Sequence, residues 1–119
     1  MHEYSIVQAL LNQCEEHAAK HQAKRITKVV TKIGVLSGVE PDLLQTAFDT
    51  FKEGTICDGA EFVMNIQPVV LYCQKCGHEA TLEMDDLILT CAKCGSLETR
   101  IVDGEEMYLM SLEMEEGER

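Results

Sequence analysis

The chain has 119 residues, which is enough for one domain or for one domain with a small annexe. It carries 21 acidic and 10 basic residues, for a net charge of -11, and it has no basic run. This argues against a nucleic-acid binder, since such proteins turn a basic face toward phosphates. Tryptophan is absent and aromatic residues make up 5% of the sequence, so the core is expected to consist of Val, Ile, Leu and Met.

The acidity has two interpretations. A net charge far from zero keeps a protein soluble, and it also attracts cations or a basic partner surface. The first residues, MHEYSIVQALLNQCEE, lack the basic region, long apolar core and cleavage site of a signal peptide. No apolar stretch approaches the roughly 20 residues that span a bilayer. We therefore expect a cytoplasmic protein whose six cysteines are reduced or metal-bound rather than paired in disulfides.

Two helices are predicted from apolar residues at helical spacing. The first runs from Glu3 to about His21, and its apolar stripe consists of Val7, Leu10, Leu11, Cys14 and Ala18. The second begins at Pro41, a residue that suits the first helical position, with acidic residues beside the positive end of the helix dipole. Its apolar residues are Leu44, Ala47, Phe48 and Phe51.

Three segments alternate with the period of a strand. In RITKVVTKIG, residues 25–34, Val29, Thr31 and Ile33 share one face, and Lys28 and Lys32 share the other. A second strand is predicted over AEFVMNIQ, with Ala60, Phe62, Met64 and Ile66 on one face. In the last strand, Tyr108, Met110, Leu112 and Met114 alternate, and the intervening Met107 and Leu109 predict burial on both faces at its start.

The only internal repeat is a pair of Cys-x-Lys-Cys-Gly segments, YCQKCG and TCAKCG, with fourteen residues between Cys76 and Cys91. Two cysteines three apart on a tight turn direct both sulfurs at one ion, and the following glycine permits a positive φ. The spacing predicts a metal site formed by Cys73, Cys76, Cys91 and Cys94. Four thiolates favour zinc or iron–sulfur chemistry, and because the shell is closed its expected role is structural.

Other candidate ligands have simpler interpretations. His17 and His21 are four apart on the first helix and are expected to be exposed polar residues, and His78 follows a cysteine shell that is already full. Cys14 is expected in the core, whereas Cys57 lies in a predicted loop and has no evident partner. The sequence shows no glycine-rich phosphate loop and no catalytic arrangement of Ser, His, Asp or Cys, so we do not expect an enzyme.

Two other functions remain open at this point. Cys-x-x-Cys-Gly pairs also hold a single iron in rubredoxin-like electron-transfer proteins, but that function leaves the residues before the first pair without a role. The second alternative is a zinc-ribbon interaction module for nucleic acid, against which the net charge argues.

Taken together, MHEYSIVQALL, VVTKIGVLSGVEPDLLQTAFD, the two cysteine turns and the closing MYLMSLEME resemble the HypA family of hydrogenase nickel-incorporation proteins. The resemblance implies an α+β fold. A small mixed sheet of about three strands with two helices forms a nickel-binding part, residues 1–71 and 103–119, and a zinc ribbon, residues 72–102, is inserted into it. It further implies delivery of Ni(II) to the large subunit of [NiFe] hydrogenase together with a HypB-type GTPase, and in some relatives to urease and its accessory proteins.

The resemblance also implies where nickel binds: Met1, His2 and Glu3 match the family's nickel site, and the four cysteines match its zinc site. The α-amine of Met1, the amide nitrogen and imidazole of His2, and the amide nitrogen of Glu3 would form a planar nitrogen shell, which suits Ni(II) and is poor for tetrahedral zinc. The carboxylate of Glu3 could hydrogen-bond the His2 ring and orient it. Some relatives carry a histidine after each cysteine pair. His78 matches the first, but Gly95-Ser96 replaces the second, so a histidine-for-cysteine exchange is not expected here.

Overall fold

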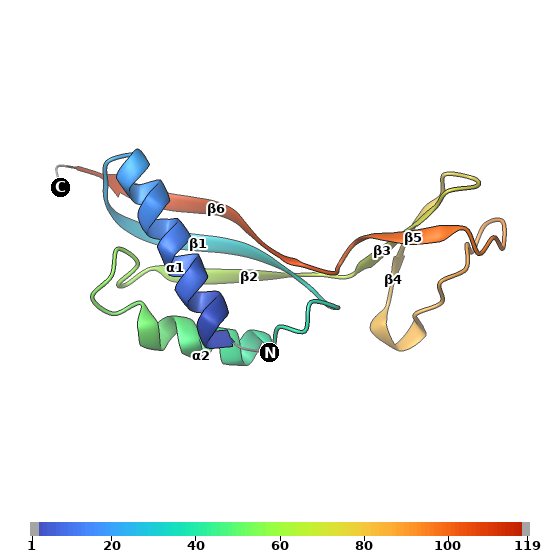
Figure 1. The fold of residues 1–119 in the computed structure, drawn as a ribbon, viewed down its shortest axis with the longest axis horizontal. Helices are drawn as coiled ribbons and strands as arrows, with labels where there is room; N and C mark the ends of the chain where they lie inside the picture. Colours follow the sequence, from blue (N-terminus) through green and yellow to red (C-terminus); the bar gives the residue numbers. More distant parts are fainter. Residues whose placement is uncertain (1–2, 118–119) are drawn as a thin grey trace.

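The computed structural model describes residues 3–117, except for the side chain of Asp86, and is elongated, with principal extents of 57 × 26 × 17 Å. Two three-stranded sheets follow each other along the long axis (Figure 1). In chain order the elements are α1 (Glu3–Lys20), β1 (Ala23–Gly34), α2 (Pro41–Phe51), β2 (Glu61–Gln67), β3 (Val69–Cys73), β4 (Glu79–Leu82), the 3-10 turn η1 (Met84–Asp86), β5 (Thr99–Asp103) and β6 (Met107–Glu116). The predicted α+β class, with two helices, a mixed sheet and an inserted cysteine ribbon, is confirmed.

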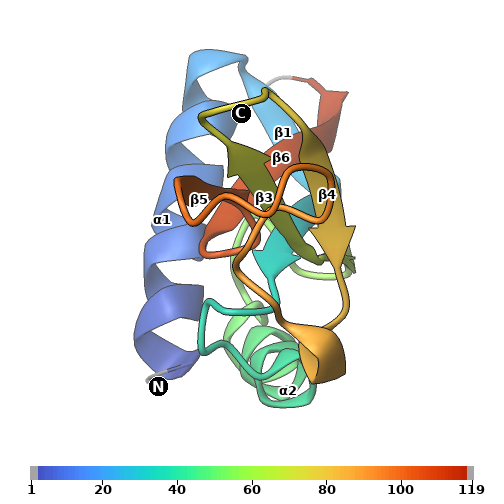
Figure 2. The ribbon, with the colours of Figure 1, turned by 90° about the vertical axis from the view of Figure 1, so that its right-hand side faces the viewer.

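The first sheet has the order β2-β1-β6, with β1 parallel to β2 and antiparallel to β6. A parallel pair cannot be joined by a tight turn, and α2 lies in the crossover between β1 and β2. In Figure 2, α1 runs along the left of the sheet and α2 lies at the bottom. The main core lies between the helices and one face of this sheet. Among the described residues, none of the helices combines the length and apolar character needed to cross a bilayer.

The alternation predicted for β1 is confirmed. Val29, Thr31 and Ile33 are fully or almost fully buried, whereas Lys28 and Lys32 lie on the more open face. The buried hydroxyl of Thr31 donates a hydrogen bond of 2.9 Å to the carbonyl oxygen of Val63, so its burial leaves no polar group unsatisfied.

The alternation predicted for the last strand is wrong in its first half. Tyr108 and Met110 are 46% and 54% exposed. The register of β6 against β1 skips Met110, and this β-bulge reverses which residues face the core. The side chains that pack against the core are Met107, Leu109, Leu112 and Met114. The start of β6 is therefore buried on one face only.

Two apolar residues predicted on core faces are exposed. Phe51 is the last residue of α2, and its ring packs edge-on against that of Tyr4, with 5.1 Å between centroids. Ile66 is 50% exposed because it lies near the end of β2, beyond Phe62 and Met64, which contact the core. The predicted start of α2 at Pro41 is confirmed.

The chain passes between the two sheets twice, at Pro68 between β2 and β3 and at Gly104 between β5 and β6. These passages touch the end of β1. A Cβ atom on Gly34 would lie 2.3 Å from the carbonyl oxygen of Gly104, and Gly104 itself has φ of +103°. The Nζ atom of Lys32 lies 2.9 Å from the Oδ2 atom of Asp103, and this contact lowers the pKa of the Asp103 carboxyl. The junction between the two sheets, where these passages meet the end of β1, is therefore closely packed. It admits no side chain at position 34.

Gly34→Ala is expected to destabilise the protein by about 3 kcal/mol, because the new methyl group meets backbone atoms that cannot rotate away. Gly54→Ala is the matched control: its Cβ would meet nothing within 4 Å, so only the positive φ of +77° opposes it, at about 1 kcal/mol. Urea unfolding of both variants measures the difference. A loss for Gly34→Ala no larger than that for Gly54→Ala would contradict the close packing of the junction.

Candidate metal centres

Four cysteine sulfurs converge at the far end of the second sheet, whose order is β4-β3-β5. Cys73 is the last residue of β3 and Cys76 lies in the turn that follows it, whereas Cys91 and Cys94 lie in the turn that precedes β5. All four Sγ atoms lie within 4.8 Å of one another. Across residues 3–117, this is the only group of three or more His, Cys, Asp or Glu residues whose ligand atoms converge in this way.

The two cysteine turns are built alike, as their repeated sequences predict. The N–H of Gly77 donates to the carbonyl oxygen of Cys73, and the N–H of Gly95 donates to that of Cys91, both at 2.8 Å. The two glycines have φ of +79° and +75°, in the left-handed region that a side chain would oppose. Each turn therefore directs its pair of thiols toward the other pair.

Backbone N–H groups stabilise two of the four sulfurs, those of Cys73 and Cys91, as thiolates. The N–H groups of Cys94 and Lys93 each lie 3.4 Å from the Sγ atom of Cys91, and they lower the pKa of that thiol to about 6. The N–H of Cys76 lies 3.4 Å from the Sγ atom of Cys73 and lowers its pKa as well. The N–H of Ser96 acts the same way on Cys94, but burial and hydrogen bonds with the other three thiols outweigh it and raise the pKa of Cys94 to about 11. The thiolate is the metal-binding form, so the folded turns favour the ligand state at Cys73 and Cys91.

The donor set and its spacing fit a zinc ion. The Sγ atoms of Cys73 and Cys94, and those of Cys76 and Cys91, are 3.6 Å apart. A sulfur tetrahedron around zinc, with bonds of about 2.3 Å, has edges of about 3.8 Å. Four thiolates leave no open position for water or a substrate. The arrangement can hold a metal and stabilise the fold, but it cannot present that metal to a reactant.

The three described histidines, His17, His21 and His78, are not part of this cluster. The backbone carbonyl of His78 accepts a hydrogen bond of 2.9 Å from the N–H of Cys73, and its side chain lines a cavity of about 240 Å³ under the cysteine turns. His17 is exposed in the last turn of α1, and His21 follows the end of that helix at Lys20 rather than extending it.

Of the three residues predicted to bind nickel, Met1 and His2 lie outside the described residues. Glu3 is the first residue of α1 and is 9% exposed. Its Oε2 atom accepts a hydrogen bond of 3.3 Å from the N–H of Glu40, the residue before α2. The carboxylate thus joins the starts of the two helices and lies near the positive dipole end of each. The sequence pattern did not predict this contact, because it joins residues 37 apart.

Cys57 has a partner that the sequence did not reveal. It is fully buried in the main core together with Cys14, which lies in the predicted apolar stripe of α1. The hydrogen bond between the two thiols and their burial raise the pKa of Cys14, which therefore stays protonated. None of the six cysteines forms a disulfide.

The chain is similar in sequence to proteins of known function over almost its whole length. The sequence model described as hydrogenase/urease nickel incorporation, metallochaperone, HypA matches residues 1–114. The chain belongs to the HypA family. A hydrogenase maturation factor HypA of Shewanella baltica (strain OS185) is 54% identical over 118 residues, 99% of each chain, and that of Aquifex aeolicus is 52% identical over 115 residues, 97% of this chain and 98% of the relative.

Solved HypA structures share the fold. The solution structure of the nickel metallochaperone HypA from Helicobacter pylori is 40% identical, with a TM-score of 0.72, and the match covers 98% of this chain and all of that one. A second HypA solution structure is 41% identical, with a TM-score of 0.75 and 96% of both chains covered. The family resemblance drawn from the sequence is confirmed. The chain is a nickel metallochaperone of hydrogenase maturation and not an enzyme.

Proposed function

We propose that this HypA-family chain binds Ni(II) at its N-terminus, through the α-amine of Met1, the amide nitrogen and imidazole of His2, and the amide nitrogen of Glu3. The observation that carries the proposal is the family match, which starts at residue 1 and includes the Met-His-Glu sequence. Nickel prefers a planar set of nitrogens. Within residues 3–117 the one convergent ligand group is all sulfur and suits zinc instead.

The contact made by Glu3 supports a site at this place. Its carboxylate fixes the start of α1 against the start of α2, so Glu3, the third residue of the proposed site, has a defined position. A chelate made by the chain end itself leaves the ion accessible to a partner, which is what the delivery of a cargo ion requires. Because its ligands must lose protons to bind, nickel affinity should fall in acid.

We propose a structural zinc in the four-cysteine shell, and with it a separate zinc domain over residues 72–102, set into a nickel-binding domain formed by residues 1–71 and 103–119. The sheet that carries the cysteines begins at Val69, three residues before the proposed start of the zinc domain at residue 72. Apart from Cys73 and Cys91, its only buried hydrophobic residues are Val69 and Leu71, both in β3. So small a core cannot hold some 30 residues in place. Zinc binding, at about 10–16 kcal/mol in small zinc domains, supplies the missing stability.

The proposed partners are a HypB-type GTPase and the hydrogenase large subunit, met in the cytoplasm, where thiols stay reduced. Urease is a second proposed client, because the family description includes urease nickel incorporation. Single-iron electron transfer and nucleic-acid binding lose their support, because neither belongs to the family that the whole chain matches.

Cys76→Ser is expected to lose most of its zinc, because three thiolates and a hydroxyl bind the ion far more weakly. Lys75→Ser, at an exposed position in the same turn, is the matched control and should keep one zinc per chain. Metal analysis with amide hydrogen exchange should show loss of protection in β3, β4 and β5 and retained protection in α1 and β1. Full zinc in Cys76→Ser, or unfolding of the whole chain without zinc, would count against a separate structural zinc domain.

His2→Ala is expected to weaken Ni(II) binding at neutral pH at least about 100-fold, or about 2.7 kcal/mol, because the imidazole that closes one chelate ring is gone. The control is His17→Ala, which removes an exposed imidazole from α1. Calorimetric titration of untagged protein gives the affinities, and zinc content and helicity should not change in either variant. Parental affinity in His2→Ala together with loss in His17→Ala would place nickel on the helix instead.

A further inference from the structure

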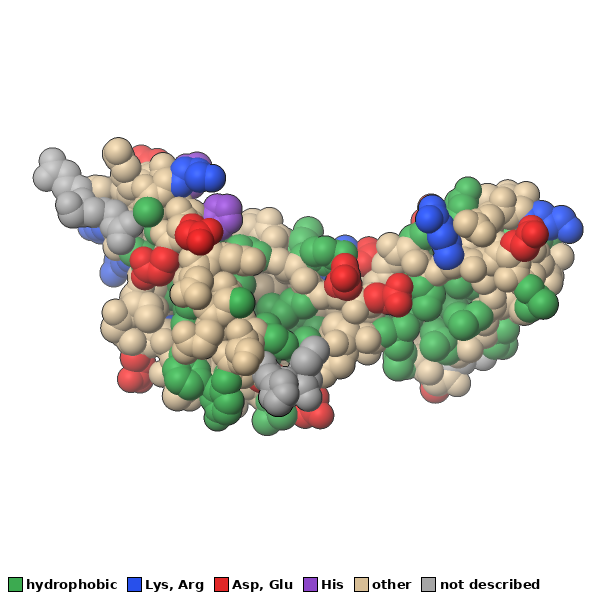
Figure 3. Space-filling view, in the orientation of Figure 1, with side chains coloured by type: hydrophobic (Ala, Val, Ile, Leu, Met, Phe, Trp, Pro, Cys, Tyr) green, Lys and Arg blue, Asp and Glu red, His purple; other side chains and the backbone are tan. Residues whose placement is uncertain are grey.

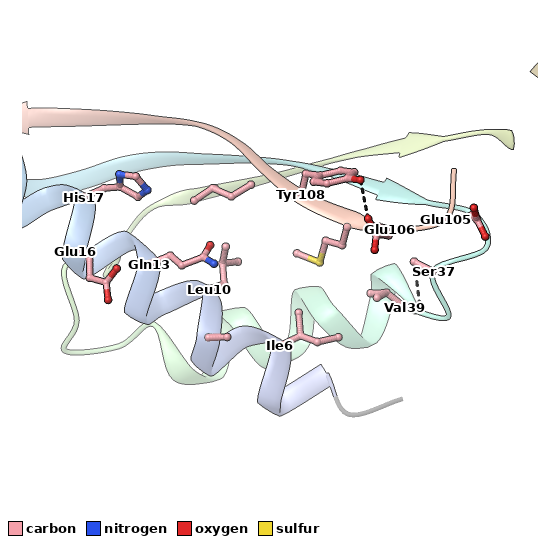
Figure 4. A pocket seen from close by; sticks show the side chains of 13 residues that line it. Ile6, Leu10, Gln13, Glu16, His17, Ser37, Val39, Glu105, Glu106 and Tyr108 are labelled. Carbon is pink, nitrogen blue, oxygen red and sulfur yellow. Dashed lines mark hydrogen bonds between the residues drawn. The ribbon is translucent and has the colours of Figure 1, made fainter. Parts of the chain in front are cut away.

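A groove of about 870 Å³ lies between α1 and β6. Figure 3 shows apolar side chains on the face over these two elements, with acidic side chains beside them toward the second sheet. In Figure 4, Ile6 and Leu10 come from α1, Val39 from the segment before α2, and Glu105, Glu106 and Tyr108 from β6 and the turn that precedes it. The aliphatic lining consists of Ile6, Ala9, Leu10, Val39, Met107 and Leu109.

One side of the groove is a sheet edge. In the order β2-β1-β6, β6 pairs with β1 alone, and among the described residues no strand pairs with its outer side. An edge strand presents a row of backbone N–H and C=O groups that another chain can pair with. At ten residues β6 is longer than an average strand, so it offers a long template.

The ends of the groove carry negative charge. Glu16 lies at one end beside His17, and the exposed Glu105 and Glu106 lie at the other. The Tyr108 hydroxyl donates a hydrogen bond of 2.8 Å to the Oε2 atom of Glu106, which fixes that carboxylate at the rim. The lining contains no lysine or arginine among the described residues. A cationic occupant would therefore meet complementary charge at both ends.

We propose that this groove binds an extended segment of a partner protein, in which apolar and basic residues alternate. Its backbone pairs with the free edge of β6, its apolar side chains enter the groove beside Leu10 and Leu109, and its basic side chains meet the glutamates of the rim. Binding at this groove is a separate property from nickel binding at the N-terminus and does not depend on it. Only the test in cells rests on the proposed function.

Two other occupants fit less well. A docked helix would fill the groove but would leave the edge of β6 unpaired. A second copy of this chain would bring its own Glu105 and Glu106 to the start of β6, so acidic residues would face acidic residues at the rim of the groove. Like charges placed opposite each other destabilise a strand pair.

A nine-residue peptide of alternating lysine and valine is the probe, with two controls: glutamate in place of lysine, and proline at the central position. We expect the Lys/Val peptide to bind with an affinity that falls as salt rises, and to slow hydrogen exchange at β6 amides in NMR spectra. Neither control peptide should bind. Equal binding of the glutamate peptide, or spectral changes confined to residues away from β6 and α1, would overturn the proposal.

Ala9→Arg and Gln8→Arg form the matched pair of variants. Both residues are exposed on α1 and the substitutions add the same charge, but only Ala9 lines the groove. Ala9→Arg should weaken peptide binding at least tenfold, and Gln8→Arg should bind as the parent does. Should the parent prove to be a dimer that Ala9→Arg dissociates, the occupant is a second copy of the chain and the proposal is wrong.

The same variants extend the test to cells that lack this chain. Ala9→Arg should bind nickel and zinc in vitro as the parent does, yet hydrogenase activity should fall at least tenfold, while Gln8→Arg should restore it. Parental hydrogenase activity with Ala9→Arg overturns the docking proposal and leaves the N-terminal nickel site untouched. Failure of nickel binding in the parent itself would instead refute the proposed function.

Discussion

The pairing of β6 with β1 is the interaction on which the rest of the structure depends. Strand β1 is the centre of the first sheet, and its partner β6 reaches it only after the chain has run out through β3 and returned through β5. Closing so long a loop costs roughly 3 kcal/mol in chain entropy. The ribbon reduces this cost because its own sheet and cysteine turns keep β3 and β5 side by side. Since β6 follows β5 in the chain, β6 then starts close to the edge of β1.

The junction explains how one chain carries two sheets without a flexible linker. Gly34 and Gly104 permit backbone to approach backbone, and the ion pair between Lys32 and Asp103 joins β1 to β5 across the same place. The ribbon is therefore held against the first sheet by packing as well as by covalent connection. In the proposed function, a resident zinc stabilises the far end, and the cargo nickel is held at the start of α1, where a partner can remove it.

Chemistry separates the two proposed metal sites. Four sulfurs, two of which have their pKa values lowered by backbone N–H groups, form a closed shell that suits an ion meant to stay. An amine, two amide nitrogens and one imidazole form an open, acid-sensitive chelate that suits an ion meant to leave. The lining of the groove beside β6 includes neither Glu3 nor any of the four cysteines.

The sequence predicted local features well and long-range ones poorly. Val29, Thr31 and Ile33 revealed β1 because one face of the strand is buried, and the spacing of the cysteines predicted the sulfur cluster because ligand geometry is local to each turn. The bulge at Met110 has no sequence signal, and it reversed the predicted face of Tyr108. The contacts of Cys57 with Cys14 and of Glu3 with Glu40 join distant segments, so only the folded chain reveals them. The N-terminal nickel site came from family resemblance and not from spacing.

The most direct test of the N-terminal chelate adds Gly-Ser before Met1 and measures Ni(II) affinity. The extension keeps every side chain but turns the α-amine of Met1 into an ordinary peptide nitrogen, which does not lose its proton near neutral pH without an anchoring amine. The extended protein should keep its fold and its zinc but lose tight nickel binding. Nickel bound with the affinity of the untagged protein would contradict the N-terminal chelate, because a site made only of side chains would not sense the extension.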